Sequence, residues 1–338
     1  MPQKVHFSSS SGQHAASAVL LLILVALFVC SLFIGRYSAS GHSLISWDLH
    51  DPMTQTVMFH LRLPRAIAAV FLGMSLAASG MVFQMIFSNP LVEPGFLGVS
   101  QGAAFGAALC IVYLGNSAIL VQVMAITFAF IGLAASWFLA NRIRYGGHIL
   151  RLVLSGIAVS AMFSAGLGIL KYLADPLSQL QEITFWLLGG LWGITWESVL
   201  PISPVVLLSL SILYKMRWRL NLLSLGDTAA TSLGVHVSQE RGIVLLAAVS
   251  ATAAVISVAG LVGWIGLIVP HLARRIFGSD ARRSFTTAML MGGIFVLACD
   301  DLGRTLLAGE IPLGILSSLI GASSFLVLML TQKVGNVA

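Results

Sequence analysis

Long runs of apolar residues alternate with short polar stretches along the whole chain. Ten such runs can be delimited, and the third and the eighth are shorter than the others. A helix needs roughly 20 apolar residues to cross the hydrocarbon core of a bilayer, so this pattern predicts an all-α polytopic membrane protein with about ten transmembrane helices. The predicted spans are 16–34, 66–87, 97–114, 118–140, 152–174, 199–213, 243–261, 262–277, 285–307 and 311–330.

The composition favours one transmembrane domain over residues 1–338. Hydrophobic residues make up 58% of the chain and charged residues only 9%, which leaves too few polar groups to cover a soluble domain. The net charge of +6 is spread over short loops, so no nucleic-acid-binding face is predicted. Cys30, Cys110 and Cys299 lie in apolar runs without metal-ligand spacing, and we interpret them as small buried side chains.

The basic residues predict the orientation. We expect residues 1–17 to form a cytoplasmic tail before an uncleaved first span, and ten spans then place the C-terminus in the cytoplasm as well. The positive-inside rule agrees, because the predicted external loops hold only Arg36, Arg62, Arg65, Lys171 and Arg304. The predicted cytoplasmic set is larger: Lys4, Arg142, Arg144, Arg151, Lys215, Arg217, Arg219, Arg241, Arg274, Arg275, Arg282, Arg283 and Lys333.

The same topology predicts an internal repeat. Spans two to five begin outside and spans seven to ten begin inside, so the two sets are expected to be inverted repeats, a common way to build a transport pathway. Between them lies the stretch 175–193, where Trp186 and Trp192 are close to Trp196, and the segment 180–188 has the length of a half-helix. We interpret it as an interfacial half-helix with an aromatic belt or, alternatively, as a half-helix at the mouth of a pathway.

A short polar stretch between the two apolar halves is the clearest candidate for a partner contact. It runs from Leu225 through Gly226 and Asp227 to Leu233 and Gly234, and basic residues flank it. The chain has no Gly-Lys dipeptide and therefore no phosphate-binding P-loop, and its spans hold few ionisable groups for proton coupling. Energy for transport is then expected from a partner that docks on this stretch.

Two further motifs leave alternatives open. Arg62 and Arg65 flank Pro64, which we expect to start the second span; these arginines either anchor the chain at the headgroups or pair with carboxylates of a soluble partner. Arg304 belongs with them unless Asp300 and Asp301 neutralise it. The two prolines and the glycine of 89–95 form either a tight turn or a constriction at the inner end of a pathway.

Five landmarks in order make the chain resemble the permease subunits of ABC importers for iron–siderophore complexes, haem and cobalamin. They are Arg62-Leu-Pro-Arg65, the stretch 89–100 (Asn-Pro-Leu-Val-Glu-Pro-Gly-Phe-Leu-Gly-Val-Ser), the Leu-Gly-Asp and Leu-Gly of 225–234, Gly-Trp-Ile-Gly-Leu-Ile-Val-Pro-His at 263–271, and Asp301-Leu-Gly-Arg304 followed by Glu-Ile-Pro-Leu-Gly at 310–314. The resemblance covers about 62–330, nearly the whole chain.

The resemblance implies a homodimer in the bacterial inner membrane with its pathway at the dimer axis, two ATPase subunits below it and a periplasmic binding protein above. The chain itself is expected to be no enzyme and to carry no cofactor, with ATP and Mg on the ATPase. The implied cargo is an iron chelate (siderophore or haem), with cobalamin or a molybdate or tungstate oxyanion as alternatives. A stand-alone secondary carrier or channel is the alternative of another class.

The resemblance also assigns residues. Binding-protein docking falls to Arg62, Arg65 and Arg304. ATPase coupling is implied within coupling helices at 222–238, by Leu225, Gly226, Asp227, Thr228, Ala229, Thr231, Leu233 and Gly234. The cytoplasmic gate is implied at Asn89, Pro90, Leu91, Ile149 and Leu150. Ile149 and Leu150 stand where the cobalamin permease has small polar residues, so a more apolar gate is expected here.

Overall fold

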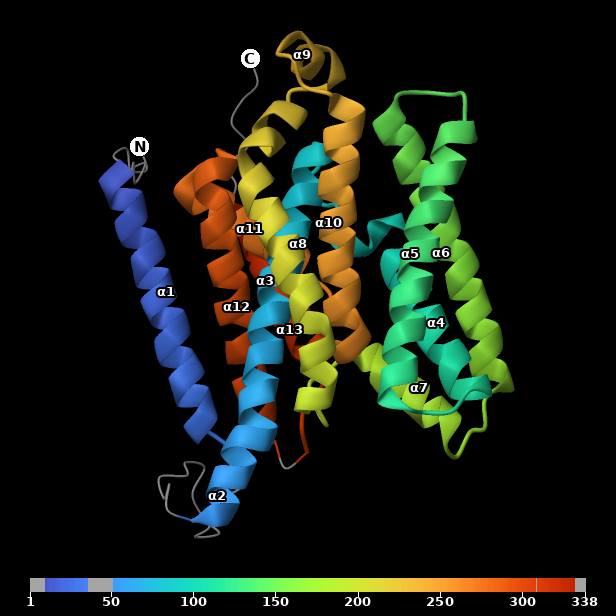
Figure 1. Ribbon diagram of the computed structural model, residues 1–338, viewed down its shortest axis with the longest axis vertical. Coiled ribbons are helices and arrows are strands. Elements are labelled where there is room, and N and C mark those ends of the chain that lie inside the picture. The colour runs from blue at the N-terminus through green and yellow to red at the C-terminus, as the bar shows by residue number, and fades with distance from the viewer. Residues whose placement is uncertain (1–9, 36–50, 308, 332–338) are drawn as a thin grey trace.

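The computed structural model describes residues 10–35, 51–307 and 309–331, and almost all of this part is helical (Figure 1). Each of the ten predicted apolar runs corresponds to one helix, so the all-α architecture is confirmed. In chain order these helices are α1 (Ser10–Phe33), α3 (Leu63–Ile86), α4 (Val99–Tyr113), α5 (Ala118–Arg142), α6 (His148–Leu173), α8 (Trp196–Leu223), α10 (Val237–Ala259), α11 (Ile265–Phe277), α12 (Ala281–Thr305) and α13 (Leu313–Thr331).

The lengths of these helices also follow the sequence. Within the described residues, eight helices are long and apolar enough to cross a membrane. The other two, α4 with 15 residues and α11 with 13, are the third and eighth runs that the sequence marks as short. The expected half-helix is α7 (Gln179–Leu188). The helix α1 already begins at Ser10, so part of the predicted tail 1–17 is helical, while residues 1–9 lie outside the described part.

The start of the second span differs from the prediction. Pro64 was expected to begin the helix, but helical structure runs without a break from Pro52 to Ile86 through α2 (Pro52–Thr56) and a π-helical stretch, η1 (Val57–Arg62). The start signal is Asp51 before Pro52: the Asp51 carboxylate accepts from the backbone N–H groups of the first turn, an N-cap. The wider π-helical turn just before Pro64 is the kind of local adjustment that accommodates a proline inside a helix.

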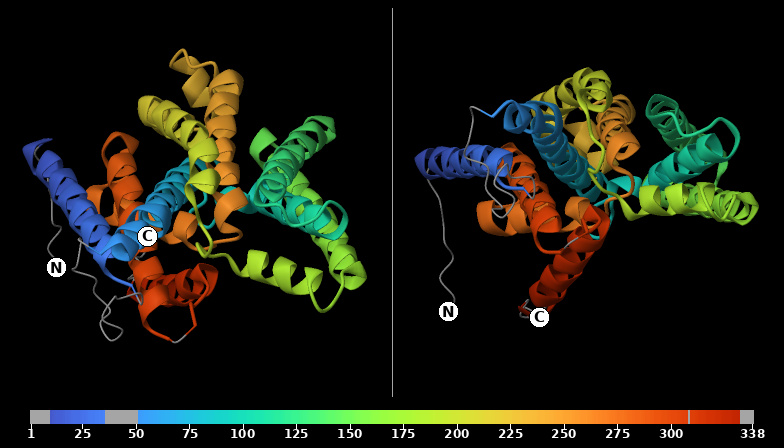
Figure 2. Two further views of the ribbon diagram at one scale, coloured as in Figure 1. Left: turned by 60° about the horizontal axis from the view of Figure 1, so that its bottom comes forward. Right: turned by 90° about the horizontal axis from the view of Figure 1, so that it is seen from below.

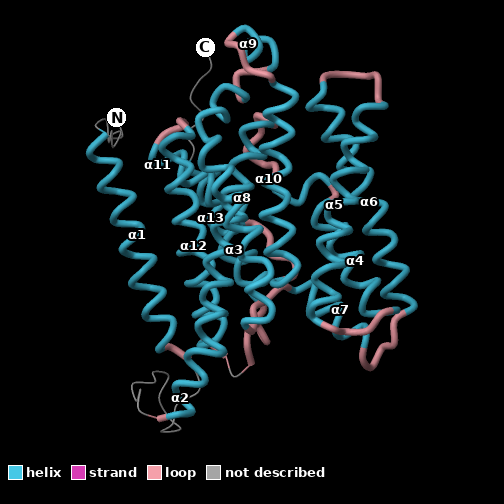
Figure 3. Tube along the Cα trace, viewed as in Figure 1, coloured by secondary structure: helices cyan, strands magenta, loops and turns pink. Residues whose placement is uncertain are grey.

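The two halves show the expected inverted order. Each consists of a long helix, an irregular segment, a short helix and two long helices: α3 to α6, and α10 to α13. The irregular segments contain η2 (Pro94–Leu97) in the first half and residues 260–264 in the second (Figure 3). Figure 1 shows α3 running toward the end of the molecule that carries the short helix α9 (Asp227–Ser232), whereas α10 starts beside α9 and runs away from it.

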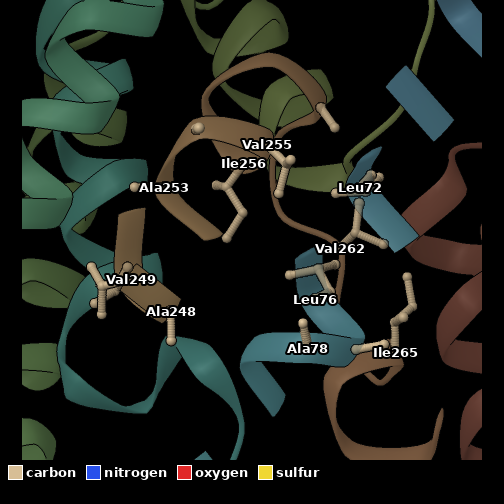
Figure 4. Close-up of a cluster of buried hydrophobic side chains, with 14 of the residues drawn as sticks. Leu72, Leu76, Ala78, Ala248, Val249, Ala253, Val255, Ile256, Val262 and Ile265 are labelled. Carbon is tan, nitrogen blue, oxygen red and sulfur yellow. The ribbon is translucent and has the colours of Figure 1, made fainter. Parts of the chain in front are cut away.

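Small residues let the central helices approach closely. A β-carbon on Gly73 of α3 would lie 2.0 Å from the carbonyl oxygen of Gly292 in α12, and one on Gly80 would lie 1.9 Å from that of Gly266 in α11. Close backbone contact at small residues is the usual way to pack helices in lipid. Apolar side chains of α3, α10 and α11 fill the core beside these contacts (Figure 4).

Charge is distributed unevenly between the two ends of the bundle. Among the described residues, eleven basic and three acidic side chains belong to the α9 end, and four basic and seven acidic ones to the opposite end. The remaining described acidic residue, Glu93, directly precedes η2 and is counted with neither end. The predicted grouping of basic residues is therefore reproduced by the positions of the helices, apart from Lys4, Arg36 and Lys333, which lie outside the described residues. The basic residues of the α9 end are Arg142, Arg144, Arg151, Lys215, Arg217, Arg219, Arg241, Arg274, Arg275, Arg282 and Arg283.

Candidate functional site

The polar stretch between the two halves forms one short helix at the end of the molecule (Figure 1). The helix α8 ends at Leu223, and α9 spans only Asp227–Ser232, so a single helix stands where coupling helices were expected over 222–238. Gly226 before α9 (φ +92°) and Gly234 after it (φ +79°) adopt backbone conformations that other residues rarely take. These two turns make α9 project between α8 and α10.

The surface of α9 is available to a partner. All eight residues assigned to ATPase coupling are exposed, and Leu225 and Leu233 at its two ends are 58% and 61% exposed. Ala230 alone points inward, where it packs against Leu223 and the valines that follow α9. The two leucines and the polar face between them are therefore open to contact with another protein. ATPase coupling through these residues stays a prediction.

An ion pair holds α9 against α10. Arg241 lies one turn into α10 and is only 2% exposed. Its guanidinium donates to both carboxylate oxygens of Asp227, with Nη1 at 3.4 Å from Oδ2 and Nη2 closer to Oδ1. The hydrogen bond from Arg241 lowers the pKa of Asp227 below its usual range. The sequence marked Arg241 only as a flanking charge; its spacing of fourteen residues from Asp227 carries no recognisable signal.

The first predicted gate segment forms a turn after α3. Asn89, Pro90 and Leu91 are all exposed, and the Asn89 side chain accepts from the backbone N–H of Leu91 at 2.9 Å. This local hydrogen bond is typical of an Asx turn. Ser88 just before it has φ +47°, so the chain reverses sharply where α3 ends.

The second predicted gate segment lies at the start of α6, at the same end of the molecule. Ile149 is half-buried, and Leu150 is exposed. The segment after Leu91 leads into η2, which packs on α6: a β-carbon on Gly156 would lie 2.7 Å from the Phe96 carbonyl oxygen. The two segments therefore border one face of the protomer, but their role as a gate stays a prediction.

Near this face, hydrogen bonds of the Gln84 side chain join α3 to α11, and the sequence did not predict them. The Gln84 amide nitrogen donates to the carbonyl oxygens of Gly266 at 3.1 Å and Leu267 at 2.9 Å. Its amide oxygen accepts from the guanidinium of Arg274. One glutamine thus holds both ends of α11 against α3.

The opposite end holds a network of arginines and carboxylates. Arg65 donates to Asp300 at 2.9–3.1 Å and to both oxygens of Glu310, at 3.0 and 2.9 Å. Asp300 is 3% exposed and Glu310 41%. The network therefore joins the start of α3 to the end of α12 and to the segment before α13. Glu310 was not expected as a partner of Arg65.

The other two predicted docking arginines are buried as well, Arg304 inside this network and Arg62 against the end of α1. Arg304 pairs with Asp300 at 3.3 Å and also with Asp301, so the alternative that these aspartates neutralise it is confirmed. Arg62 donates to the carbonyl oxygens of Leu32 and Phe33 at the end of α1, at 2.9 and 3.0 Å. Arg65 is the most exposed of the three, at 14%, and binding-protein docking stays a prediction.

A groove of about 620 Å³ runs between α7 and α13. No charged residue is found among the described residues that line it, and Ser318 supplies its only polar side chain among them. Within the same described ranges, no group of three or more His, Cys, Asp or Glu side chains is placed to hold a metal ion. The described lining of the groove is therefore almost entirely apolar. The groove is lined by Leu187, Leu188, Leu261, Gly263, Gly314, Ile315, Ser318, Leu319 and Ala322.

Comparison with known proteins gives a consistent result over nearly the full chain. Residues 22–331 match the model of the FecCD transport family. The chain is 40% identical over 325 residues to the molybdate import system permease protein MolB of Haemophilus influenzae, covering 94% of this chain and 96% of that protein. It is 39% identical over 318 residues to the hemin transport system permease protein HmuU of Yersinia pestis, with 93% and 95% covered.

Comparison with solved structures supports the same family. A solved structure of a metal-chelate type ABC transporter in an inward-facing conformation superimposes with a TM-score of 0.86 at 38% identity, covering 94% of this chain and 99% of that one. Members of the matched family are permease subunits of ABC importers, in which a separate subunit hydrolyses ATP. The chain, a multi-pass membrane protein with a projecting helix at its basic end, therefore belongs to the FecCD transport family.

Proposed function

We propose that this permease imports an iron chelate, such as a siderophore complex or haem, across the bacterial inner membrane. The observation that carries the cargo class is the groove between α7 and α13, whose described lining holds no charged residue. A pathway for a large, internally neutralised complex has little need of charge, whereas buried charges inside a membrane are costly unless paired. Similarity to a hemin permease and to a metal-chelate type transporter supports the same class.

We place the α9 end in the cytoplasm. Its eleven basic and three acidic side chains, counted over the described residues, agree with the positive-inside rule. The start of α1 lies at this end (Figure 1), so the N-terminus, and with ten spans the C-terminus, are cytoplasmic in this arrangement. The network of Arg65 and its carboxylates then faces the periplasm.

The assembly we propose contains two copies of this chain, two ATPase subunits and one periplasmic binding protein. The exposed leucines around α9 enter a groove on the ATPase, which carries ATP and Mg, while this chain carries no cofactor. The second copy packs against the side of α6, α7 and α13, so that the two grooves face each other at the dimer axis. Movement of α9 then opens and closes the exposed gate segments around Leu91 and Leu150.

Docking of the binding protein falls to Arg65 in this proposal, because its guanidinium is the least buried of the three arginines. Arg65→Glu is expected to weaken the binding protein's affinity at low salt, with a smaller difference at high salt, because exposed charge pairs are screened. Lys171→Glu makes the same charge change at the same end of the molecule and serves as the control. Equal affinities of wild type and Arg65→Glu at low salt would remove Arg65 from the docking surface.

Molybdate is the second candidate cargo, because MolB of Haemophilus influenzae is 40% identical over 94% of this chain. The two candidates separate in one uptake experiment. The full complex in proteoliposomes is given iron chelates, cobalamin and molybdate together, and the lumen is analysed for iron, cobalt and molybdenum. ATP-dependent accumulation of iron supports the iron chelate as the cargo. Accumulation of molybdenum or cobalt alone would identify molybdate or cobalamin as the cargo instead.

A further inference from the structure

Within the described part of the chain, one ion pair joins α9 to the membrane domain. Arg241 is 2% exposed and forms the bidentate pair with Asp227 described above. The surrounding apolar support is small: Ala230 packs on Leu223, Val235 and Val237. Because Arg241 lies one turn into α10 and is almost fully buried, a displacement of α9 that keeps the ion pair is expected to displace the beginning of α10 as well.

The helix α10 is built to carry such a displacement across the membrane. It runs for 23 residues without an internal proline or an interruption, a length of about 35 Å. Every residue from Ala251 to Ser257 is buried, and Figure 4 shows apolar side chains of this stretch close to those of α3 and α11. A close-packed interior transmits displacement because it has little empty volume.

At its far end, α10 meets α7 and α13 through glycine backbone. The N–H of Gly190 donates to the Ala259 carbonyl at 2.8 Å, and the N–H of Gly314 donates to the Gly189 carbonyl at 3.3 Å. The glycines of this junction have no room for a side chain: a β-carbon on Gly260 would lie 2.1 Å from a carbonyl oxygen of α7. Gly189 and Gly260 also have φ values of +65° and +69°.

The junction borders the groove. The last two residues of α7 and the first turn of α13 both line it, through Leu187, Leu188 and Gly314, and Figure 2 shows α7 lying across this end of the bundle. Contacts between backbones without intervening side chains leave few rotamers to absorb a shift. Movement of the end of α10 is therefore passed to the walls of the groove.

We propose that Arg241 is the positioning residue through which α9 drives α10, and that the glycine junction of Gly189, Gly190, Gly260 and Gly314 passes this movement to the groove at the opposite end. The inference rests on the proposed docking of an ATPase on α9. It goes further by naming the internal connection between the two ends of one protomer.

The test uses the full complex in proteoliposomes, with ATP hydrolysis and uptake measured together. Arg241→Lys is expected to keep ATP hydrolysis. Both Arg241→Lys and Asp227→Asn are expected to lower uptake per ATP about tenfold, a typical size for a coupling effect. The exchanged pair Asp227→Arg with Arg241→Asp is expected to recover part of the loss. Gly242→Ala is the control within α10, because its β-carbon would meet no atom within 4 Å.

Two reporter cysteines, each introduced in a Cys30→Ser background, test the Asp227–Arg241 ion pair and the glycine junction separately. Thr228→Cys reports on α9 and Leu187→Cys on the groove, and both are labelled with a water-soluble maleimide before and after nucleotide trapping. In the wild-type background both labelling rates are expected to change with nucleotide. With Gly260→Ala, the change at position 228 should persist and the change at position 187 should disappear.

Wild-type uptake per ATP in both Asp227→Asn and Arg241→Lys would overturn the role of Arg241. A nucleotide response at position 187 that survives Gly260→Ala would overturn the junction. If Gly260→Ala does not fold, the same comparison is made with Arg241→Lys, in which the response at position 187 must fall. Failure of the proposed function is a different result, namely absence of ATP-dependent uptake by the wild-type complex.

Discussion

Burial decides how much each carboxylate of the Arg65 network contributes to stability. Asp300 is 3% exposed and is shared by Arg65 at 2.9 Å and Arg304 at 3.3 Å. Asp300→Asn keeps the size and shape of the side chain but removes the negative charge shared by the two nearly buried guanidinium groups. Breaking a buried ion pair in this way costs about 3–5 kcal/mol of stability. Glu310 binds the same Arg65 at 2.9 Å but is 41% exposed, so Glu310→Gln is expected to cost only about 0–1 kcal/mol.

The two variants form a matched pair, because each replaces one carboxylate by its amide on the same arginine. Reversible unfolding of the purified permease, titrated with denaturing detergent and followed by tryptophan fluorescence, gives the free energy of unfolding of each. We expect Asp300→Asn to lose several times more stability than Glu310→Gln. Equal losses, or a larger loss for Glu310→Gln, would refute the reasoning that burial sets the strength of this network.

Three further predictions concern the packing, the α9 link and the gate. Gly73→Ala places a β-carbon 2.0 Å from a carbonyl oxygen of α12 and should lower the free energy of unfolding by about 1–3 kcal/mol in the same titration. The control Gly168→Ala, whose β-carbon would meet no atom within 4 Å, should lower it little. Equal losses of stability would contradict the close packing. Because a hydrogen-bonded guanidinium lowers the pKa of Asp227, the link stabilises α9 above the unfolded value of about 3.9 and is lost as pH falls through the lower folded value. The protection of the α9 amides against hydrogen exchange, corrected for the intrinsic pH effect, should therefore stay constant between about pH 5 and 8. A loss of protection near neutral pH would contradict the ion pair. Leu91→Ala combined with Leu150→Ala should make liposomes leak cargo without ATP, and an absence of leak would remove both residues from the gate.

The helices could be predicted from the sequence because lipid imposes a single strong constraint on it. Each of the ten helices needs an apolar run, and even the short α4 and α11 are visible as short runs. The exposed stretch at 225–234 was visible for the opposite reason, since polar residues between two apolar halves have no place in the hydrocarbon core. These signals are local, and each lies within one segment of the chain.

The interactions that were missed join residues far apart in sequence. Arg65 and Glu310 are separated by 245 positions and Gln84 and Arg274 by 190, so neither pair leaves a local pattern. Pro64 was misread because a proline at the start of a helix and a proline after a π-helical turn have the same local sequence. Asp51 followed by a proline was the better start signal, and it was overlooked because it lies outside the apolar run.

The central claim is that this chain transports only as part of an ABC importer, and not as a stand-alone carrier. The most direct measurement is uptake of the iron chelate into proteoliposomes that contain the permease with its ATPase and binding protein, compared with the same vesicles lacking each component in turn. The account predicts accumulation that requires ATP and all three proteins, and that an ion gradient cannot replace. Accumulation by the permease alone under a proton or sodium gradient would contradict it.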